Sequence, residues 1–198
     1  MLSPIQRFID VFSKLPSLGP RFATRLAFYI VNQEKSKREE LIAALTLLNN
    51  VNRCERCFFL KMDTETLCDI CGDKKRNTKK IAIVEKETDI LSIERSHSWS
   101  GHYLVLGSLP EHGILETEHK LRLSKLKTRI STELGGSIDE LVIALNPTTF
   151  GDFVASVINE EFKQLTKNIT RIGRGIPTGG EIEFADEETL KSALDRRI

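Results

Sequence analysis

The four cysteines of this chain, its whole complement, lie in one short stretch. They form two Cys-x-x-Cys pairs separated by ten residues, namely Cys54 and Cys57, then Cys68 and Cys71. Two such pairs at this separation place four thiolates where a small knuckle can surround one Zn²⁺ tetrahedrally. Because four protein ligands leave no open position for water, we expect the ion to stabilise the fold rather than act as a Lewis acid.

Two other uses of paired cysteines fit the rest of the sequence less well. A disulfide framework is typical of secreted proteins, and residues 1–7 lack the charged and then apolar pattern of a secretion signal. A redox Cys-x-x-Cys usually occurs as a single pair on a βαβ unit. We therefore predict one structural zinc ion per chain, in a cytoplasmic protein.

The composition is that of a globular chain with an uneven distribution of charge. Of its 198 residues, 40% are hydrophobic and 29% are charged, and no apolar run reaches the length of a membrane span. Residues 1–80 carry 15 Lys and Arg against 9 Asp and Glu, a net charge of +6, whereas residues 81–198 carry 14 against 19, a net charge of −5. This asymmetry predicts a polyanionic partner for the first part and a different partner for the second.

Two helices with a tight turn between them are expected near the N-terminus. Apolar residues recur at helical spacing in residues 5–12, Pro16 ends that element, Gly19 permits a close turn and Pro20 begins the next helix. We interpret the segment as a helix-hairpin-helix. In such a hairpin, unpaired backbone N–H groups and the helix dipole point at a phosphate group.

The second of these helices carries two arginines on one face. Arg21 and Arg25 are four residues apart and can flank the same sugar-phosphate backbone, which they would contact without reading bases. An ordinary helical turn with two surface arginines is the alternative. We expect Phe22, Leu26 and Ile30 to be core residues rather than base-stacking groups.

A further helix and a basic run surround the cysteines. Residues 38–51 predict an amphipathic helix with Leu41, Leu45 and Leu48 on its apolar face. Residues 74–80 contain five lysines and arginines, which we interpret as an exposed linker to a second domain, with DNA contact as the alternative.

From Ile81 onward, strand and helix patterns alternate. The expected strands are residues 81–84, 103–106, 141–145 and 169–172, and the expected helices are a segment capped by Thr88, residues 115–130 and residues 150–165. Such alternation predicts an α/β domain with a mainly parallel sheet. Its ligand edge should lie at the carboxyl ends of the strands.

Polar residues follow two of these strands at that edge. They are Glu85, Glu87 and Asp89 after the first strand, then Asn146, Thr148 and Asp152 after the third. A Mg²⁺ site for phosphoryl transfer needs several converging carboxylates, and here the third strand offers mainly an amide and a hydroxyl. We therefore favour a non-catalytic edge and keep a Mg²⁺-dependent enzyme as the alternative.

The C-terminal segment begins as a glycine-rich loop. It lacks a Gly-Lys-Ser/Thr ending, so a nucleotide-binding P-loop is not expected. Ile182 and Phe184 alternate with acidic residues in the manner of an edge strand, and residues 189–197 predict a short closing helix. An apolar tail of this kind can pack on a neighbouring subunit.

The four histidines show no ligand spacing. His97, His102, His112 and His119 lie in polar stretches without a Glu-x-x-His or His-x-x-x-His pattern. We expect surface histidines, and we predict no catalytic residue of the Ser-His-Asp or Cys-His type, because the cysteines are assigned to zinc.

In this order, the parts resemble the bacterial recombination mediator family RecR. The resemblance rests on the helix-hairpin-helix, the four-cysteine knuckle, the segment Ile83-Val-Glu-Lys-Glu-Thr-Asp-Ile-Leu-Ser-Ile-Glu-Arg95 and the segment Arg171-Ile-Gly-Arg-Gly-Ile-Pro-Thr-Gly-Gly-Glu-Ile-Glu-Phe-Ala-Asp-Glu187. It covers nearly the whole chain and implies a multidomain α+β and α/β fold. The implied parts are a helix-hairpin-helix region (residues 1–52), a four-cysteine zinc finger (53–76), a Toprim domain (80–172) and a C-terminal tail for subunit packing (173–198).

The resemblance also implies a function. The chain would be a non-enzymatic, ring-like clamp on DNA, a homo-oligomer that works with RecO and RecF to help load a recombinase at gaps. Gly19, Arg21 and Arg25 would face DNA, and Glu85, Asp89, Asn146 and Thr148 would form the face that RecO engages. The alternative is a Mg²⁺-dependent Toprim nuclease or primase-like enzyme.

Two positions and one loop depart from the family pattern. Ser17 stands where the hairpin usually has a first glycine, and Lys86 stands where the family usually has an acidic residue. The loop after Leu106 also differs from that of the family, so contacts made there are not transferred to this chain.

Overall fold

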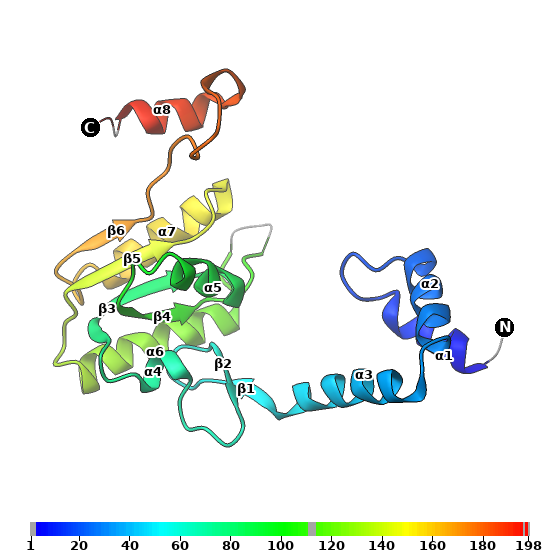
Figure 1. The fold of residues 1–198 in the computed structure, drawn as a ribbon. Helices are drawn as coiled ribbons and strands as arrows, with labels where there is room; N and C mark the ends of the chain where they lie inside the picture. Colours follow the sequence, from blue (N-terminus) through cyan, green and yellow to red (C-terminus); the bar gives the residue numbers. More distant parts are fainter. Residues whose placement is uncertain (1–2, 111–113, 196, 198) are drawn as a thin grey trace. The chain divides into compact units, whose positions relative to one another are not determined.

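The computed structural model describes residues 3–110, 114–195 and 197 of the chain (Figure 1). The chain divides into two compact units, Met1–Val51 and Asn52–Ile198. The cysteines therefore belong to the same unit as the sheet, and residues 74–80 do not separate compact units. The division into four segments made from the sequence stays a prediction.

From Ser3 to Asn50, the first unit consists of helices joined by short turns. It contains α1 (Ser3–Phe12), α2 (Pro20–Val31), α3 (Lys35–Leu47) and the short 3₁₀ helix η1 (Leu48–Asn50). Its small core consists of Ile9 from α1 with Ala23 and Ala27 from α2. The rings of Phe8 and Phe12 stack beside it with centroids 3.9 Å apart. The expected pair of helices joined by a turn is confirmed.

The apolar faces of this unit differ from the expectation. Phe22 was expected in the core but is 54% exposed, whereas Ala23 and Ala27 fill the interface with α1 and Leu26 and Ile30 are half-buried. Small residues allow the two helices to approach closely, so the larger neighbours turn outward. All residues of α3 other than the half-buried Arg38 are exposed, including the leucines of its predicted apolar face.

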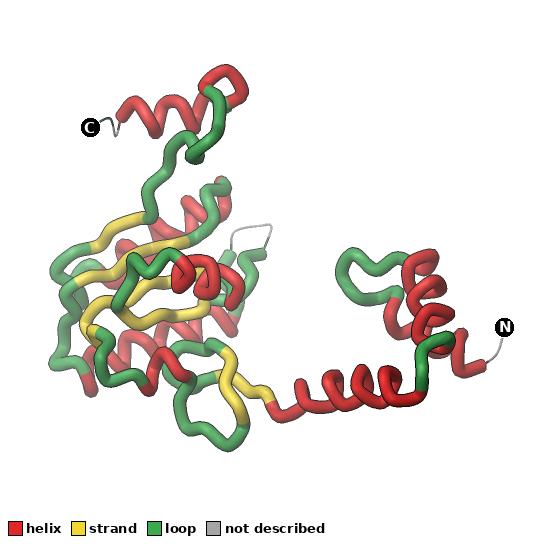
Figure 2. Tube along the Cα trace, viewed as in Figure 1, coloured by secondary structure: helices red, strands yellow, loops and turns green. Residues whose placement is uncertain are grey.

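The second unit is an α/β domain that carries a small two-stranded appendage. In chain order its elements are β1 (Val51–Arg53), β2 (Leu60–Met62), α4 (Asp69–Gly72), β3 (Asn77–Val84), α5 (Glu87–Arg95), β4 (Gly101–Val105), α6 (Thr117–Glu133), β5 (Glu140–Ala144), α7 (Thr149–Phe162), β6 (Ile169–Arg171), η2 (Ile182–Phe184) and α8 (Glu187–Asp195). The main sheet has the order β4-β3-β5-β6, and all of its pairs are parallel (Figure 1). The strands are yellow in Figure 2. The predicted α/β class is confirmed.

Strand β3 lies inside the sheet and is buried on both faces. Ile81 and Ile83 pack into a cluster with leucine, isoleucine and phenylalanine side chains of α6 and α7. Ala82 and Val84 point to the opposite face, where they pack with Ile90 of α5 and with the four cysteines. Because successive side chains of a strand alternate between faces, an unbroken apolar run here supplies two cores at once.

Several element boundaries differ from those predicted. β3 begins at Asn77, so the assignment of residues 77–80 to a linker is wrong, although these residues are largely exposed. The N-cap of α5 is Lys86, not Thr88, which lies within the helix. The prediction of an edge strand at Ile182 and Phe184 is also wrong, because this segment forms the 3₁₀ helix η2.

Among the described residues, no helix combines the length and the apolar character needed to cross a membrane.

Candidate functional site

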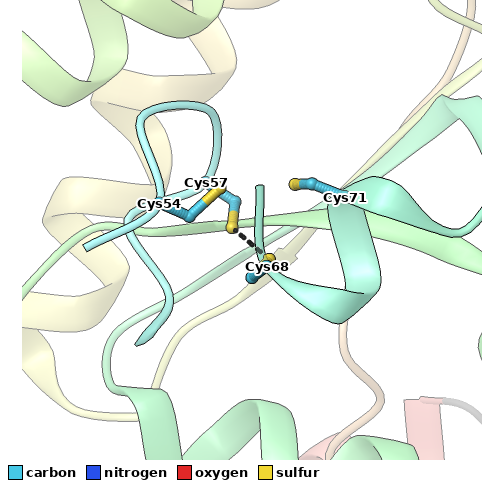
Figure 3. A group of neighbouring side chains, drawn as sticks. All are labelled: Cys54, Cys57, Cys68 and Cys71. Carbon is cyan, nitrogen blue, oxygen red and sulfur yellow. Dashed lines mark hydrogen bonds between the residues drawn. The ribbon is translucent and has the colours of Figure 1, made fainter. Parts of the chain in front are cut away.

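The four cysteines converge on one point in the second unit (Figure 3). Their Sγ atoms all lie within 4.8 Å of one another, every one of the four residues is buried, and none is in a disulfide. A tetrahedral tetrathiolate site with metal–sulfur distances of about 2.3 Å requires sulfur atoms about 3.8 Å apart. The Sγ atoms of Cys57 and Cys68 are 3.4 Å apart, so the arrangement fits one metal ion with little adjustment.

Local backbone hydrogen bonds fix the first cysteine pair. The N–H of Phe58 donates to the carbonyl of Cys54 (2.8 Å), and the N–H of Cys54 donates to the carbonyl of Phe59 (2.7 Å). The N–H of Phe59 also donates to the Sγ of Cys57 at 3.4 Å. Phe58 has a φ of 62°, in the left-handed region, which closes the turn around the sulfur atoms. We call residues 52–72 the knuckle.

The second cysteine pair is presented by a single helical turn. Cys68 is the N-cap of α4, and its carbonyl accepts the N–H of Gly72 at 2.9 Å. Hydrogen bonds from neighbouring thiols, that of Cys57 first, lower the pKa of Cys54, whereas the same interactions raise the pKa of Cys57. Thiolate is the form in which a cysteine binds a metal ion.

The knuckle covers an edge of the main sheet. The N–H of Val105 in β4, the terminal strand, donates to the carbonyl of Cys57 at 2.8 Å. The cysteines share their apolar cluster with Tyr103 and Val105 of the same strand. The knuckle thereby covers part of this strand edge, and the four cysteines are held against a rigid element.

The strand-end residues predicted as a partner face fall into two groups. Glu85, only 8% exposed, follows β3, and its Oε2 accepts a hydrogen bond from the side-chain amide of Asn146 at 2.7 Å. Its Oε1 lies 3.4 Å from the N–H of Leu109 and 3.6 Å from the Nζ of Lys86. The adjacent parallel strands β3 and β5 therefore bring Glu85 and Asn146 together, as their positions predicted.

The other two residues of this group stabilise helix starts. The Oδ2 of Asp89 accepts the backbone N–H of Lys86 (2.8 Å) at the beginning of α5. The Oγ1 of Thr148, the N-cap of α7, accepts the N–H of Gly151 (3.0 Å). Both side chains lie at the same sheet edge as Glu85, but their hydrogen-bonding capacity is partly used by the fold.

The remaining carboxylates at this edge are engaged by arginines. Glu87 pairs with Arg53, and Asp152 pairs with both Arg171 and Arg174. The hydrogen bond from Arg174 holds the pKa of Asp152 below its ordinary value. Within the described residues, the cysteines form the one group of three or more His, Cys, Asp or Glu side chains close enough to share a metal ion.

The hairpin arginines lie beside an open helix start. Gly19 is the N-cap of α2 and supplies no side-chain hydrogen bond, and Pro20 is the first helical residue. Arg21 and Arg25 are exposed, and the side chain of neither forms an ion pair or hydrogen bond with the described residues. Gly19 itself is extended (φ −72°, ψ 167°) with open space around its Cα, so the positive φ of the turn falls on Ser17 (φ 63°).

The prediction that the histidines lie on the surface is wrong for two of them. His102 and His119 are buried, whereas His97 is exposed as expected and His112 lies outside the described residues. The Nδ1 of His119 accepts the N–H of Glu116 (3.1 Å) at the start of α6, and the Nδ1 of His102 lies 3.2 Å from the Nη2 of Arg129. Burial, followed by the charge of Arg129, lowers the pKa of His102 to about 4.

The sequence patterns also did not predict the burial of two arginines. Arg122 and Arg129 of α6 are 3% and 5% exposed. The one indication of their burial in the sequence is position: Arg122 comes directly before the core residue Leu123, and Arg129 directly before the core residue Ile130. A charged residue next to the apolar stripe of a helix usually reaches solvent, so spacing alone does not indicate burial.

Known proteins match this chain over nearly its whole length. The chain is 38% identical over 198 residues to "Recombination protein RecR" of Chloroflexus aggregans, a match that covers 98% of this chain and 93% of the relative. The chain belongs to the RecR family. RecR proteins of Gloeobacter violaceus and Prochlorococcus marinus strain AS9601 are 36% and 38% identical, and the matches cover 98% of this chain and 96% and 95% of those relatives.

Three family descriptions match successive parts of the chain. A RecR helix-hairpin-helix matches residues 5–48, a Toprim domain matches residues 79–173 and a RecR C-terminal segment matches residues 175–198. The resemblance inferred from the motifs is thus confirmed. The relatives are named as recombination proteins, and membership of their family supports a recombination-repair role for this chain.

Proposed function

We propose that this chain is a DNA-binding recombination mediator, a ring-like clamp that works with RecO and RecF to help load a recombinase at gaps, in the cytoplasm and near the nucleoid. Membership of the RecR family and the positive charge of residues 1–80 support it. The observation that carries the proposal is the pair of exposed, unpartnered arginines, Arg21 and Arg25, beside the uncapped start of α2. This arrangement suits phosphate groups and gives no means of reading bases.

DNA binding by Arg21→Ala/Arg25→Ala tests the proposal. We expect weaker binding to single- and double-stranded DNA, alike for all sequences, because phosphate contacts carry no sequence information. The slope of log affinity against log salt should fall in magnitude by roughly two, since each lost phosphate contact removes about 0.9 on duplex DNA. Titrations at several salt concentrations measure both effects.

A matched control separates the arginines from net charge. Lys163→Ala/Lys167→Ala also removes two positive charges, but both lysines lie in the α/β unit, where they pair with Glu160 and Asp139. This variant should bind DNA as the wild type does. Equal affinities and salt slopes for all three proteins would remove the hairpin from the proposed function.

We further propose that the ion at the knuckle is Zn²⁺. Four thiolates in a tetrahedral arrangement are a donor set that zinc favours, and a closed site of this kind has a structural role. The convergence of four buried sulfur atoms supports the assignment. Purified protein should contain one zinc per chain by elemental analysis, and Cys54→Ser/Cys57→Ser should lose it; another metal at full occupancy in cells supplied with zinc would contradict the assignment.

The edge formed by Glu85, Asp89, Asn146 and Thr148 is our proposed docking face for RecO. Asn146 and Thr148 are exposed, and Glu85 bonds to Asn146, so the face combines a held carboxylate with accessible polar groups. Glu85→Gln/Asn146→Ala should reduce capture of purified RecO while leaving DNA binding unchanged. Glu160→Gln, which alters an exposed acid of α7, is the control; the same RecO affinity in all three proteins would argue against this face.

The oligomer of the proposed clamp is assembled from further copies of this chain. Helix α3 and η1 expose a series of apolar side chains between 43% and 64% accessible, namely Leu41, Ile42, Leu45, Leu47 and Leu48, and the tail exposes Ile182 and Phe184 at 70% and 77%. Apolar surface of this extent on a soluble chain is typical of subunit contacts. Leu45→Gln/Leu48→Gln should shift the mass measured by light scattering toward smaller species, whereas an unchanged mass would exclude α3 from the contact.

A further inference from the structure

Helix α6 presents a basic face to the knuckle. Arg122, Lys125 and Arg129 are three and four residues apart, so they lie on one side of the helix. The guanidinium carbon of Arg122 lies 4.8 Å from the centre of the Phe58 ring, and the Nζ of Lys125 lies 5.4 Å from it. Phe58 directly follows Cys57, so the turn that carries the first cysteine pair rests on two cations.

Strand β4 connects the same helix to the knuckle a second time. The Nη1 of Arg122 donates to the carbonyl of Val105 at 2.9 Å, and the N–H of Val105 donates to the carbonyl of Cys57 at 2.8 Å. At the end of α6, Glu133 pairs with Arg56 of the knuckle at 3.3 Å. The knuckle is therefore bonded to α6 directly and through β4.

Arg129 is the least satisfied group in this interface. It is 5% exposed, and its Nε and Nη1 have no hydrogen-bond partner among the described residues. Its Nη2 lies 3.2 Å from the Nδ1 of His102, and its Nε lies 3.8 Å from the nearest carboxylate oxygen, that of Glu133. A guanidinium buried in this way is costly unless negative charge lies nearby.

The knuckle that this helix contacts contains the four clustered cysteines. Arg129 lies one turn after Lys125 and one turn before Glu133, and these two residues contact Phe58 and Arg56 of the knuckle, so Arg129 is on the face of α6 that meets the knuckle. Burial lowers the pKa of Arg129, and the charge of Cys71 opposes this effect. A divalent ion bound by four thiolates leaves a double negative charge on the cluster. That charge is buried with the cysteines, where it is screened less than at the surface.

We propose that Arg129 is a positioning residue of the metal centre, whose guanidinium balances the charge of the metal–thiolate cluster. The inference rests on the proposed metal centre. Without this cation, the four thiolates would repel one another more strongly and hold the ion less tightly. They would also react more readily with electrophiles, because a balanced thiolate is a weaker nucleophile. Residues outside the ligand set commonly have this influence on metal sites.

Three variants test the inference on the full-length protein. Arg129→Gln removes the charge, Arg129→Lys keeps it, and Lys120→Gln removes a charge from the exposed face of the same helix. Zinc affinity is measured by competition with a chromophoric chelator, and thiolate reactivity by the rate of alkylation in the zinc-loaded protein. The sulfur-to-cobalt charge-transfer absorption of the Co²⁺-substituted protein reports the electrostatic environment of the thiolates.

For Arg129→Gln we expect zinc affinity to fall roughly 10- to 100-fold, as for other outer-sphere changes at metal sites. Its alkylation should be faster and its charge-transfer band should shift, whereas Arg129→Lys and Lys120→Gln should remain close to the wild type. A purely structural role would not be rescued by lysine and would not move the absorption band.

The inference is overturned if Arg129→Gln folds and matches the wild type in zinc affinity, alkylation rate and cobalt spectrum. If Arg129→Gln does not fold, Arg129→Lys decides: wild-type behaviour in all three measurements supports charge balance, and a loss of affinity contradicts it. A wild-type protein without metal at the cysteines removes the proposed metal centre and this inference together. If the wild type binds zinc and Arg129→Gln behaves like it, the proposed metal centre stands and only this inference is removed.

Discussion

The two compact units of this chain solve the problem of burial in different ways. The α/β unit encloses its sheet between α6 and α7 on one face and α5 with the cysteines on the other, so large side chains such as Phe162 and Tyr103 are fully buried. The N-terminal unit buries only Ile9, Ala23 and Ala27 among its described apolar residues and exposes most of the larger ones. The α/β unit therefore encloses its own apolar core, whereas the N-terminal unit has apolar surface available for other molecules.

Size explains much of this difference. A unit of about 50 residues has too little interior to enclose large side chains on several helices at once, and it usually needs a metal, disulfides or a partner. A sheet with helices on both faces buries each strand twice, and each fully buried Leu or Ile contributes roughly 1.5–3 kcal/mol. The knuckle, which packs on that sheet, therefore belongs energetically to the self-sufficient unit.

Removal of the metal should give the largest difference in stability between the two units. Chelation should lower the free energy of unfolding of the α/β unit by several kcal/mol, because binding of structural zinc supplies on the order of 10 kcal/mol to small knuckles. Hydrogen–deuterium exchange should quicken in β4 and the knuckle and stay unchanged in α1 and α2. Zinc added back should restore protection, and equal protection in both states would show that the knuckle is stable without its ion.

Acid should weaken the α/β unit through His102. Its pKa is about 4 in the folded protein against 6.5 for an ordinary histidine, so the unfolded chain binds the extra proton between these values. The contribution of neutral His102 to the free energy of unfolding is complete above pH 6.5 and is lost as the pH falls to about 4. It amounts to no more than about 3 kcal/mol.

Urea unfolding across this pH range measures the effect of His102. His102→Gln should flatten the pH dependence, whereas His97→Gln, at an exposed position, should follow the wild type. Parallel curves for the wild type and His102→Gln would mean that His102 does not couple protons to folding.

Gly151 tests how tightly the sheet edge is packed. A Cβ at this position would lie 2.1 Å from the carbonyl oxygen of Asn146, so α7 would have to move. Gly151→Ala should lower the free energy of unfolding by about 2 kcal/mol, as for other overpacked sites. Gly175→Ala, at a position with open space, is the control, and equal stability of the two variants in chemical denaturation would refute the close approach.

Ser17 offers the smallest effect, confined to the other unit. Its φ of 63° is unfavourable for any residue with a Cβ, so Ser17→Gly should stabilise the hairpin by about 1 kcal/mol. The gain should appear as slower exchange in α1 and α2 only. Gly19→Ala should be nearly neutral, because Gly19 is extended and unobstructed; a gain that spreads to the sheet would mean that the two units do not unfold separately.

Much of the fold followed from short-range patterns. The four strands were placed to within a few residues, because an unbroken apolar run followed by a polar residue marks a buried parallel strand wherever it occurs. The ends of elements were less accurate. Thr88 resembles a helix cap, but α5 already begins at Glu87, with the extended Lys86 as its N-cap. Residues Asn77–Lys80 extend β3, although their polar character suggested a linker.

The side chains of the candidate sites were predictable to different degrees. The joining of Glu85 and Asn146, 61 residues apart, follows once their strands are known to be adjacent and parallel. The pairing of Asp152 with Arg174 does not follow, because it depends on the path of the tail after β6. Phe22 was misassigned because alanines, rather than the larger residues, form the contact between α1 and α2.

The sequence by itself determined the four-cysteine cluster and the class of the sheet domain, because the spacing of cysteines and the runs of apolar residues act over a few neighbouring positions. Only the tertiary structure decided that His102 and Arg129 are buried and that α6 turns its basic face toward Phe58 of the knuckle. Burial of a charged group depends on partners contributed by residues far away in the chain, and a local sequence pattern does not show which distant residues will lie beside it.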